Sequence, residues 1–371
     1  MKIVILGTSF PFRGGLAAYN ERLAQEFMAQ GHDVIIYTFT LQYPTFLFPG
    51  SSQYSEGPPP KGLIIKQKVN SINPFNWIMV GLELKKLKPD LLIIKFWLPF
   101  MAASFGTICR IVKKNKITKI ISILDNVIPH EKRFGDLQFI KYFVSSVDAF
   151  IAMSDSVKKD LEKFTTKKCL LQNHPIYDNF GASIPKAVAI KNLSLDSHTP
   201  YILFFGFIRD YKGLDLLLES LKDEKLQNLP FKAIIAGEFY TDPQPYLDKI
   251  KLWKLDDKVI LRTDFIPDEE VKNYFCAADL VVQPYKTATQ SGVTQICYHF
   301  NKPMLVTDVG GLAEIVPHLK AGYVVPLDCL KIAEAIYDFY TSHREKDMVA
   351  FVSAEKKKYA WSEMTNAIIS L

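Results

Sequence analysis

Short apolar runs alternate with longer amphipathic stretches along the whole chain of 371 residues. This alternation is typical of strand–helix units and predicts parallel sheets. Amphipathic periodicity predicts helices over 16–30 and 156–164 in the first half, and Gly31 stands where a C-cap glycine is expected. The predicted strands of this half are Ile3–Leu6, Val34–Tyr37, Leu91–Ile94, Ile120–Ile123 and Ala149–Ala152.

The second half repeats this alternation. Its predicted helices cover 214–221, 246–253, 269–277, 293–300 and 330–340. Its predicted strands are Tyr201–Phe205, Lys232–Ala236, Val259–Leu261, Leu280–Gln283, Met304–Thr307 and Tyr323–Val325. The pattern weakens between the halves, where Pro, Asn, Gly and Ser are frequent, which indicates a linker.

The sequence therefore predicts an α/β protein with two doubly wound, Rossmann-like domains of similar size. We place the first domain at 1–177, the linker at 178–199 and the second domain at 200–355. Paired domains of this kind commonly bind a ligand in the cleft between them.

Composition narrows the possible partners. The formal net charge is +6, which suits a small anionic ligand such as a nucleoside diphosphate, or an anionic membrane surface. Lys and Arg are not clustered as they are in nucleic-acid-binding proteins. Five scattered cysteines without a Cys-x-x-Cys pair indicate neither a disulfide framework nor a zinc site, and favour a reducing, cytoplasmic location.

Two apolar stretches could suggest membrane targeting. The N-terminal run Met1–Gly7 is too short for a signal peptide and is better interpreted as a buried first strand. The longer stretch Leu91–Val112 is interrupted by Lys95, Pro99 and Arg110, so we do not expect it to span a membrane.

The first candidate site follows the strand that opens the second half. Gly206 permits a tight turn there, and Arg209 and Lys212 come next, before Gly213 opens a helix. An Arg and a Lys three residues apart can converge on phosphate oxygens at the ligand-binding edge of a parallel sheet. The alternative is that both charges are simply solvated at a helix start.

A second candidate site is the Thr/Ser/Gly-rich loop that follows Leu280–Gln283 and enters a helix. Such a loop presents free backbone N–H groups to an anion. The alternative is an ordinary Ser N-cap. The candidate ligand-binding residues are Gln290, Ser291, Gly292, Val293, Thr294 and Gln295.

Two further glycine pairs follow predicted strands. Gly14-Gly15 opens the first helix and makes a candidate anion site, although the surrounding sequence does not have the dinucleotide pattern Gly-x-Gly-x-x-Gly. Gly310-Gly311 precedes Glu314, which could accept a ligand hydroxyl, although a helix-capping role is the safer interpretation.

The remaining candidate lies in the first half. Asp125, Asn126, His130 and Glu131 follow Ile120–Ile123 and could bind sugar hydroxyls or an acceptor. A structural hydrogen-bonded His–Glu pair is the alternative.

Together these elements resemble the family-4 glycosyltransferases, which have the GT-B fold. The resemblance covers nearly the whole chain and rests on four features in order. They are the Gly14-Gly15 loop with a helix ending at Gly31-His32-Asp33-Val34, Phe205-Gly206 with Lys212-Gly213, Gly237-Glu238, and Ser291-Gly292 with Lys302-Pro303 and Gly310–Glu314.

The resemblance implies two domains facing a central cleft, a donor site in the second domain, no bound metal or cofactor, and retention of anomeric configuration. It also implies that a final helix, 356–371, returns to the first domain. By position, Arg209 and Lys212 match the phosphate-binding pair, and Gly15 matches the first-domain glycine near the diphosphate.

Two departures stand out. Many members carry two glutamates before the Lys-Pro strand, where this chain has Ala288 and Ile296, although Gln290 and Gln295 lie nearby. In addition, Asp125 stands where many members have a His.

We therefore expect transfer of a sugar from a nucleoside diphosphate sugar to a glycan or lipid-linked acceptor, in polysaccharide or cell-envelope synthesis. A sugar-nucleotide epimerase of the same architecture and a non-catalytic nucleotide-sugar-binding protein are the rivals. The segment Pro74–Val80, followed by Lys85, Lys86 and Lys88, suggests peripheral contact with the inner face of a membrane. Core packing beside a solvated basic face is the equal alternative.

Overall fold

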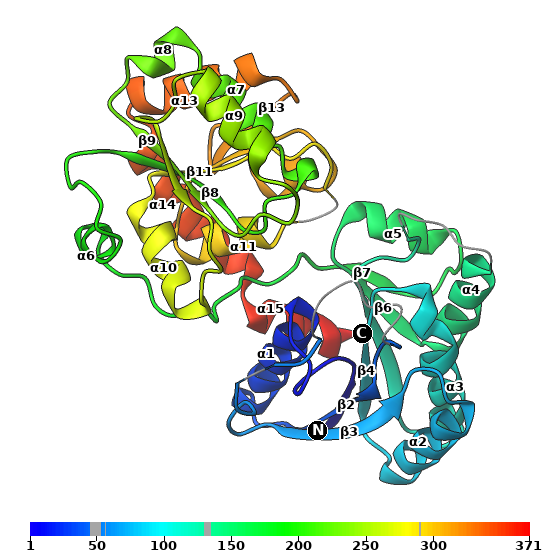
Figure 1. Cartoon of the computed structure of the whole chain (residues 1–371). Coiled ribbons are helices and arrows are strands. Elements are labelled where there is room, and N and C mark those ends of the chain that lie inside the picture. Colours follow the sequence, from blue (N-terminus) through cyan, green and yellow to red (C-terminus); the bar gives the residue numbers. More distant parts are fainter. Residues whose placement is uncertain (45–52, 56, 130–134, 289–290) are drawn as a thin grey trace. The chain divides into compact units, whose positions relative to one another are not determined.

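The computed structural model describes residues 1–44, 53–55, 57–129, 135–288 and 291–371. They form two compact units (Figure 1). Unit 1 comprises Met1–His174 and Trp361–Leu371, and unit 2 comprises Pro175–Ala360.

Unit 1 is built on a parallel sheet whose described strands have the order β3-β2-β1-β4-β5-β6-β7. The chain begins at β1 in the interior of the sheet, moves outward through β2 and β3, and returns to continue on the other side with β4. The switch point therefore lies between β1 and β4. The strands are β1 (Lys2–Leu6), β2 (Asp33–Leu41), β3 (Ile64–Asn70), β4 (Leu91–Phe96), β5 (Lys119–Leu124), β6 (Ala149–Ala152) and β7 (Cys169–Leu171).

Helices cover both faces of this sheet. On one face, α1 (Gly15–Ala29) and α15 (Trp361–Ser370) pack against apolar side chains of β1 and β4. The other face carries α2 (Pro74–Leu87), α3 (Ala102–Lys113), α4 (Asp136–Ser146) and α5 (Asp155–Glu162). The short helix η2 (Pro99–Met101) precedes α3. Because both faces are buried, the central strands are apolar almost throughout.

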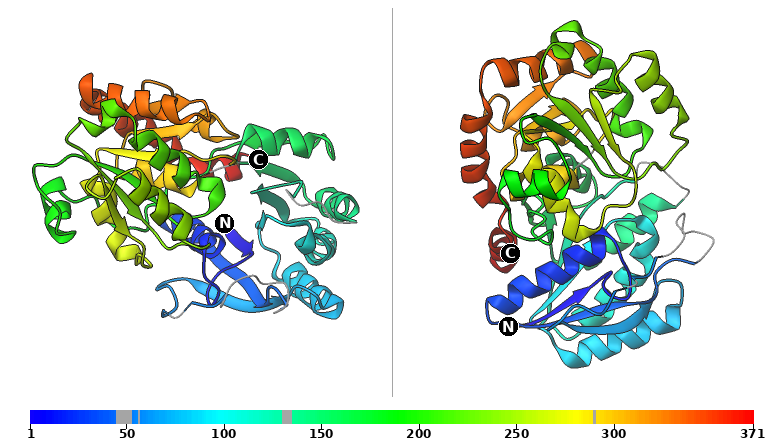
Figure 2. Two further views of the ribbon diagram at one scale, coloured as in Figure 1. Left: turned by 45° about the horizontal axis from the view of Figure 1, so that its top comes forward. Right: turned by 60° about the vertical axis from the view of Figure 1, so that its left-hand side comes forward.

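The C-terminal helix α15 belongs to unit 1 although the chain reaches it through unit 2. In Figures 1 and 2 it lies beside α1. The ring centroids of Trp361 and Tyr19 are 5.0 Å apart, and Gln30 Nε2 donates to Thr365 Oγ1 over 2.7 Å. These contacts bury the apolar side of a helix that would otherwise face water.

Unit 2 repeats the architecture, with the described strand order β10-β9-β8-β11-β12-β13 and parallel pairing throughout. Its switch point lies between β8 and β11. The prediction of two doubly wound domains is confirmed. The strands are β8 (Tyr201–Phe205), β9 (Lys232–Ala236), β10 (Val259–Arg262), β11 (Leu280–Gln283), β12 (Met304–Thr307) and β13 (Gly322–Val325).

The helices of unit 2 also divide between the two faces. One core contains residues of α7 (Leu214–Leu221), α8 (Glu224–Gln227), α9 (Gln244–Leu252) and α13 (Cys329–Thr341). The other contains residues of α6 (Lys186–Asn192), α10 (Asp268–Ala277), α11 (Gly292–His299), α12 (Leu312–Ile315) and α14 (Glu345–Glu355). Two short helices, η3 (Asp210–Lys212) and η4 (Lys356–Tyr359), complete the unit.

The segment 178–199, which we predicted to be a linker, is instead part of unit 2. It contains α6, whose Ala189 and Ile190 are buried against the core that α10 also joins. A seven-residue helix carries too little periodicity to stand out in the sequence. No helix in the described ranges is long and apolar enough to cross a membrane.

Candidate functional site

The candidate donor site of unit 2 lies at the switch point, where loops leave the carboxyl ends of β8 and β11. Gly206 follows β8 with a φ of 97°, and Gly213 precedes α7 with a φ of 70°. A Cβ on Gly213 would lie 1.9 Å from the carbonyl oxygen of Pro284, which follows β11. Only glycine permits this approach, so the two loops are held together by direct backbone contact.

The Lys212 ammonium lies against Gly206. A Cβ added to Gly206 would lie 2.8 Å from Lys212 Nζ and 4.0 Å from Cγ2 of Val293. Residues predicted from two separate loops, Gly206 and Lys212 after β8 and Val293 after β11, therefore lie close to one position. The geometry supports the interpretation of Lys212 as a site residue over that of a solvated charge.

Lys212 is only 9% exposed, yet its ammonium has no hydrogen bond or ion pair within the described residues. Burial, reinforced by the positive charge of Arg209, lowers its pKa from 10.5 to about 8. The ring of Tyr285, 5.6 Å away, gives a weak cation–π contact. A buried cation with so little compensation is matched electrostatically to an anion from outside the chain.

Arg209 is positioned by an aromatic residue. Its guanidinium carbon lies 3.9 Å from the centroid of the Tyr240 ring, a cation–π contact that sequence reasoning missed. In the part of the chain that the structure describes, the guanidinium makes no hydrogen bond or ion pair, so its fork of donors can serve a ligand.

The short helix η3, which carries Lys212, is fixed by Lys286. The Lys286 ammonium pairs with Asp210 at 2.7 Å and with Asp215 at 3.0 Å. Its backbone N–H donates to Tyr211 O over 2.7 Å. These contacts join the β11 loop to the segment between β8 and α7, and nothing in the local sequence indicated them.

Ser291 does not act as the ordinary N-cap that we considered. Its Oγ instead donates to Gln283 Oε1 over 2.7 Å, and Thr294 Oγ1 donates to the same oxygen over 3.1 Å. Ser291 does not cap α11, and among the described residues no side chain accepts from the first N–H groups of this helix. This arrangement favours a backbone cradle for an anion. Gln283 was missed, although a polar residue ending an apolar strand at a switch point is a usable signal.

The other predicted residues of this domain are not all placed as expected. Gln290 lies outside the described residues. Gln295 is buried, and among the described residues neither amide atom finds a hydrogen-bond partner. Glu314 is exposed on the four-residue helix α12, and none of the described hydrogen bonds involves its carboxylate, so the capping role is not observed.

The candidates in the first half belong to unit 1. Gly14 and Gly15 are exposed at the start of α1, which has no side-chain cap. His130 and Glu131 lie outside the described residues. Asp125 is held by the buried Lys95, whose ammonium lies 2.8 Å from its carboxylate and 3.4 Å from the centroid of the Tyr19 ring.

Two family models match the chain in succession. One, described as Glycosyltransferase Family 4, matches residues 13–170, and the other, described as Glycosyl transferases group 1, matches residues 199–342. The chain belongs to the group 1 glycosyltransferases of the family-4 type.

Two relatives of this glycosyltransferase show low sequence identity to it. A Bacillus subtilis protein named as a teichuronic acid biosynthesis glycosyltransferase is 24% identical over 264 residues, which cover 70% of this chain and 63% of that protein. An uncharacterized glycosyltransferase of Methanocaldococcus jannaschii is 22% identical over an alignment of 409 residues, covering 100% of this chain and 97% of the other.

Solved structures share the fold. HepE of Anabaena, crystallised in complex with UDP, superposes with a TM-score of 0.73 at 15% identity over the full length of both chains. The GT-B fold of this glycosyltransferase is thereby shown, and the expected fold class is confirmed.

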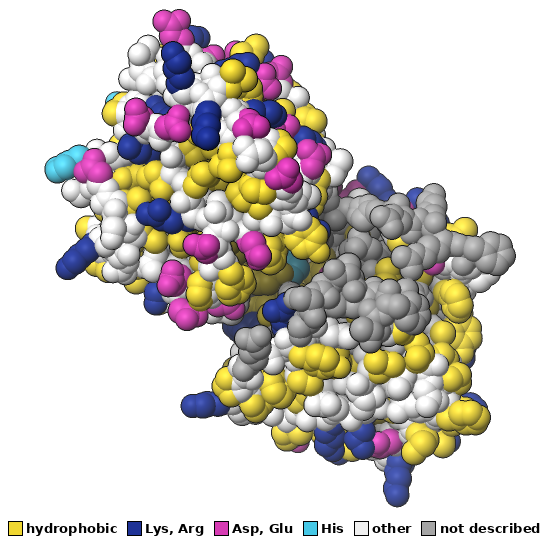
Figure 3. Space-filling model, viewed as in Figure 1, with side chains coloured by type: hydrophobic (Ala, Val, Ile, Leu, Met, Phe, Trp, Pro, Cys, Tyr) yellow, Lys and Arg dark blue, Asp and Glu magenta, His cyan; other side chains and the backbone are white. Residues whose placement is uncertain are grey.

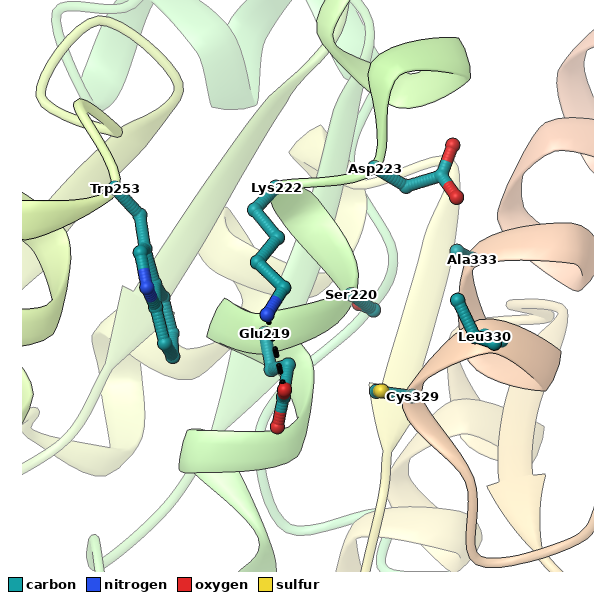
Figure 4. Close-up of a pocket in the computed structure, with 8 residues that line it drawn as sticks. All are labelled: Glu219, Ser220, Lys222, Asp223, Trp253, Cys329, Leu330 and Ala333. Carbon is teal, nitrogen blue, oxygen red and sulfur yellow. Dashed lines mark hydrogen bonds and ion pairs between the residues drawn. The ribbon is translucent and has the colours of Figure 1, made fainter.

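One surface pocket of the glycosyltransferase lies away from the candidate donor residues. It has a volume of about 420 Å³ and lies around the C-terminal end of α7, with Trp253 on one side and Cys329 and Leu330 on the other (Figure 4). Lys212 precedes the opposite, N-terminal end of α7. Because ligands of doubly wound sheets bind at the carboxyl ends of strands, we do not assign the donor to this pocket.

Proposed function

We propose that this glycosyltransferase moves a sugar from a nucleoside diphosphate sugar to an acceptor hydroxyl, with retention of anomeric configuration and without a bound metal ion. The observation that carries the proposal is the buried Lys212 ammonium, which lies against Gly206 and has no anionic partner among the described residues. It is supported by the complexes of the similarly folded HepE with UDP and with UDP-glucose.

In this proposal the donor diphosphate binds between two cationic side chains and the partly positive N–H groups at the start of a helix. Lys212 and Arg209 face it from the β8 loop, and the first N–H groups of α11, at Gly292 and Val293, face it from the other side. Fixed charges of this kind stabilise a leaving group whose negative charge grows in the transition state.

The bond between the anomeric carbon and the diphosphate oxygen breaks while the acceptor oxygen bonds to the same carbon on the same face. The acceptor proton passes to an oxygen of the departing diphosphate. Lys212 and Arg209 neutralise the diphosphate and need not exchange a proton with the acceptor.

For the acceptor we propose a glycan or a lipid-linked sugar of a polysaccharide or cell-envelope pathway. The name of the Bacillus relative, which refers to teichuronic acid biosynthesis, supports this class. In unit 1, Asp125 is the side chain that we propose to contact the acceptor or the sugar, with Lys95 fixing its carboxylate.

The experiment compares wild type with Lys212→Ala and Lys222→Ala across a panel of nucleoside diphosphate sugars. Lys222 is a matched control because it follows the far end of α7, next to the remote pocket. Removing one preorganised donor to a developing oxyanion lowers turnover by roughly 100- to 1,000-fold, so Lys212→Ala should fall into this range and Lys222→Ala should not. Equal rates for all three proteins would contradict the assignment.

Further readouts separate the rival functions. An altered sugar nucleotide formed from donor alone would indicate an epimerase, and donor binding without turnover on any acceptor would indicate a binding protein. NMR of the product's anomeric proton tests retention, and unchanged activity in excess chelator tests independence from metal.

A further inference from the structure

The helix α2 of unit 1 has an apolar outer face. Phe75 is 80% exposed and Met79 is 70% exposed, and Ile78 and Leu82 are also exposed. Positions 75, 78, 79 and 82 are spaced by three and four residues, so they form one stripe along two turns of the helix. Helices on the surface of a protein normally place polar residues there.

The apolar stripe does not face the core of unit 1, because the opposite face of α2 packs there. Val80, Gly81 and Leu84 are buried. A Cβ on Gly81 would lie 2.9 Å from Cβ of Ile111, so α2 packs closely on α3 at this point. Core packing therefore accounts for Val80 but not for Phe75 or Met79, whose side chains are exposed.

Most charges on and around the stripe are basic. Lys85 and Lys86 lie in the last turn of α2, where they continue the direction of the stripe, and exposed Lys88 follows. The first turn contains no acidic residue, and Glu83, the acidic residue of α2, is paired with Lys68 at 3.1 Å. Because α2 and α3 both lead into parallel strands, exposed Lys114 and Lys116 at the end of α3 lie at the same edge of the unit.

We propose that the outer face of α2 is a docking surface for an anionic lipid membrane. An amphipathic helix that lies in a membrane interface needs exposed apolar side chains to insert and nearby cations to contact lipid headgroups. Phe75, Ile78, Met79 and Leu82 supply the first, and Lys85, Lys86 and Lys88 supply the second. Figure 3 shows hydrophobic and basic side chains close together along the outer border of unit 1.

This surface is separate from the residues proposed to bind the donor, which belong to unit 2. The membrane proposal can thus fail while donor binding stands. If it holds, it brings unit 1 to a surface where a lipid-linked acceptor would be found.

The experiment measures co-sedimentation of the full chain with vesicles of phosphatidylcholine alone and with added phosphatidylglycerol. The variant Phe75→Ser/Met79→Ser should bind anionic vesicles at least tenfold less strongly than wild type. The matched control is Leu252→Ser, which removes a 74% exposed leucine from α9 of unit 2 and should bind like wild type. Lys86→Glu/Lys88→Glu should weaken binding to anionic vesicles roughly 25-fold or more, since each lysine near the surface contributes about fivefold.

The substituted side chains are exposed, so the variants should keep the thermal melting curve of wild type. Independently of any substitution, hydrogen exchange of wild type should show protection of the α2 amides, but not of the α9 amides, when anionic vesicles are added. Absence of wild-type binding, or full binding by Phe75→Ser/Met79→Ser, would overturn the proposal. Conversion of a dimer to a monomer by that variant, measured by light scattering without vesicles, would assign the surface to a second copy instead.

Discussion

Lys212 is buried without a negative partner among the residues that the structure describes, and this arrangement makes ligand binding sensitive to pH. Its pKa in the free protein is about 8, lowered from 10.5 by burial and by the charge of Arg209. A bound diphosphate would place negative charge beside the ammonium and raise the pKa again. Donor binding above pH 8 should therefore take up a proton.

The size of the proton uptake and of the loss of affinity follows from the pKa of Lys212. The fall of the Lys212 pKa from 10.5 to about 8 corresponds to roughly 3 kcal/mol between the charged and neutral forms. At pH 7 Lys212 is charged in both the free and the bound protein, so little uptake is expected. At pH 9 it is neutral in about nine-tenths of free molecules, which predicts uptake of nearly one proton and about tenfold weaker binding than at pH 7.

Isothermal titration calorimetry with UDP, in two buffers of different ionisation enthalpy, measures this uptake directly. At pH 9 the phosphates of UDP are already fully ionised and do not contribute, since their last pKa is about 6. Lys212→Arg keeps the charge at this pH and should remove the uptake. Lys258 is the control: its pKa is also about 8, but its ammonium donates to the carbonyls of Leu226 and Leu229. Lys258→Arg should leave the uptake unchanged.

The same burial affects stability. Because the folded-state pKa of Lys212 lies below the unfolded value, the charged lysine destabilises the fold fully below pH 8, and this cost is relieved as the pH rises from about 8 to 10.5. Lys212→Met should therefore raise the melting temperature at pH 7 by a few degrees while abolishing UDP binding. Absence of proton uptake at pH 9, together with equal affinity at pH 7 and pH 9, would refute the assignment of Lys212 to the diphosphate.

Three further predictions concern the neighbours of this site and the C-terminal helix. Gly206→Ala should weaken UDP binding at least tenfold, because the added methyl group would collide with Lys212 Nζ. The control is Gly181→Ala, which is also at positive φ but has only a lysine methylene nearby and should change stability alone. UDP titration measures the first effect and thermal melting the second. Tyr240→Ala should weaken UDP binding a few-fold, the equivalent of roughly 0.5–1 kcal/mol for an exposed cation–π contact, and unchanged affinity would show that Arg209 needs no support. Trp361→Ala should lower the free energy of unfolding by about 3–5 kcal/mol in denaturant titration, since Trp361 is buried between α15 and α1; a loss below 1 kcal/mol would mean that α15 is not firmly docked.

Periodicity predicted the central strands well because a strand buried on both faces is apolar at every position. Predictions such as Ala149–Ala152 and Tyr201–Phe205 coincide with β6 and β8. The two strands that were missed, β3 and β7, are the edges of the unit 1 sheet. Edge strands contact solvent, so β3 contains lysines and β7 has only three residues. Neither has the pattern of a buried strand.

Within the candidate site, the sequence indicated residues that act through the backbone or through a strand-end position. Gly206 and Val293 were found in this way, whereas Lys212 was found from its spacing to Arg209. Side-chain partners from other elements were not found: Tyr240, which contacts Arg209, lies in a separate loop, and Gln283, which accepts a hydrogen bond from Ser291, ends β11. A local pattern can mark Gln283 as a polar residue at a strand end, but the contact partners of Gln283 and Tyr240 are seen only in the packed structure.

The described part of the chain buries three lysines, and comparing them shows why Lys212 is different. Lys95 has the carboxylate of Asp125, and Lys258 has two backbone carbonyls. Lys212 has only the distant ring of Tyr285 and, nearby, the like charge of Arg209. Burying a cation is costly unless it is paired. Lys95 and Lys258 have such partners within the chain, so the fold would gain stability if Lys212 had one too or were replaced by an apolar residue. The cost is offset if an anion binds there during function. The position of Lys212 fits the proposed diphosphate site, because it lies at the switch point of the sheet near the start of α11, which no described side chain caps.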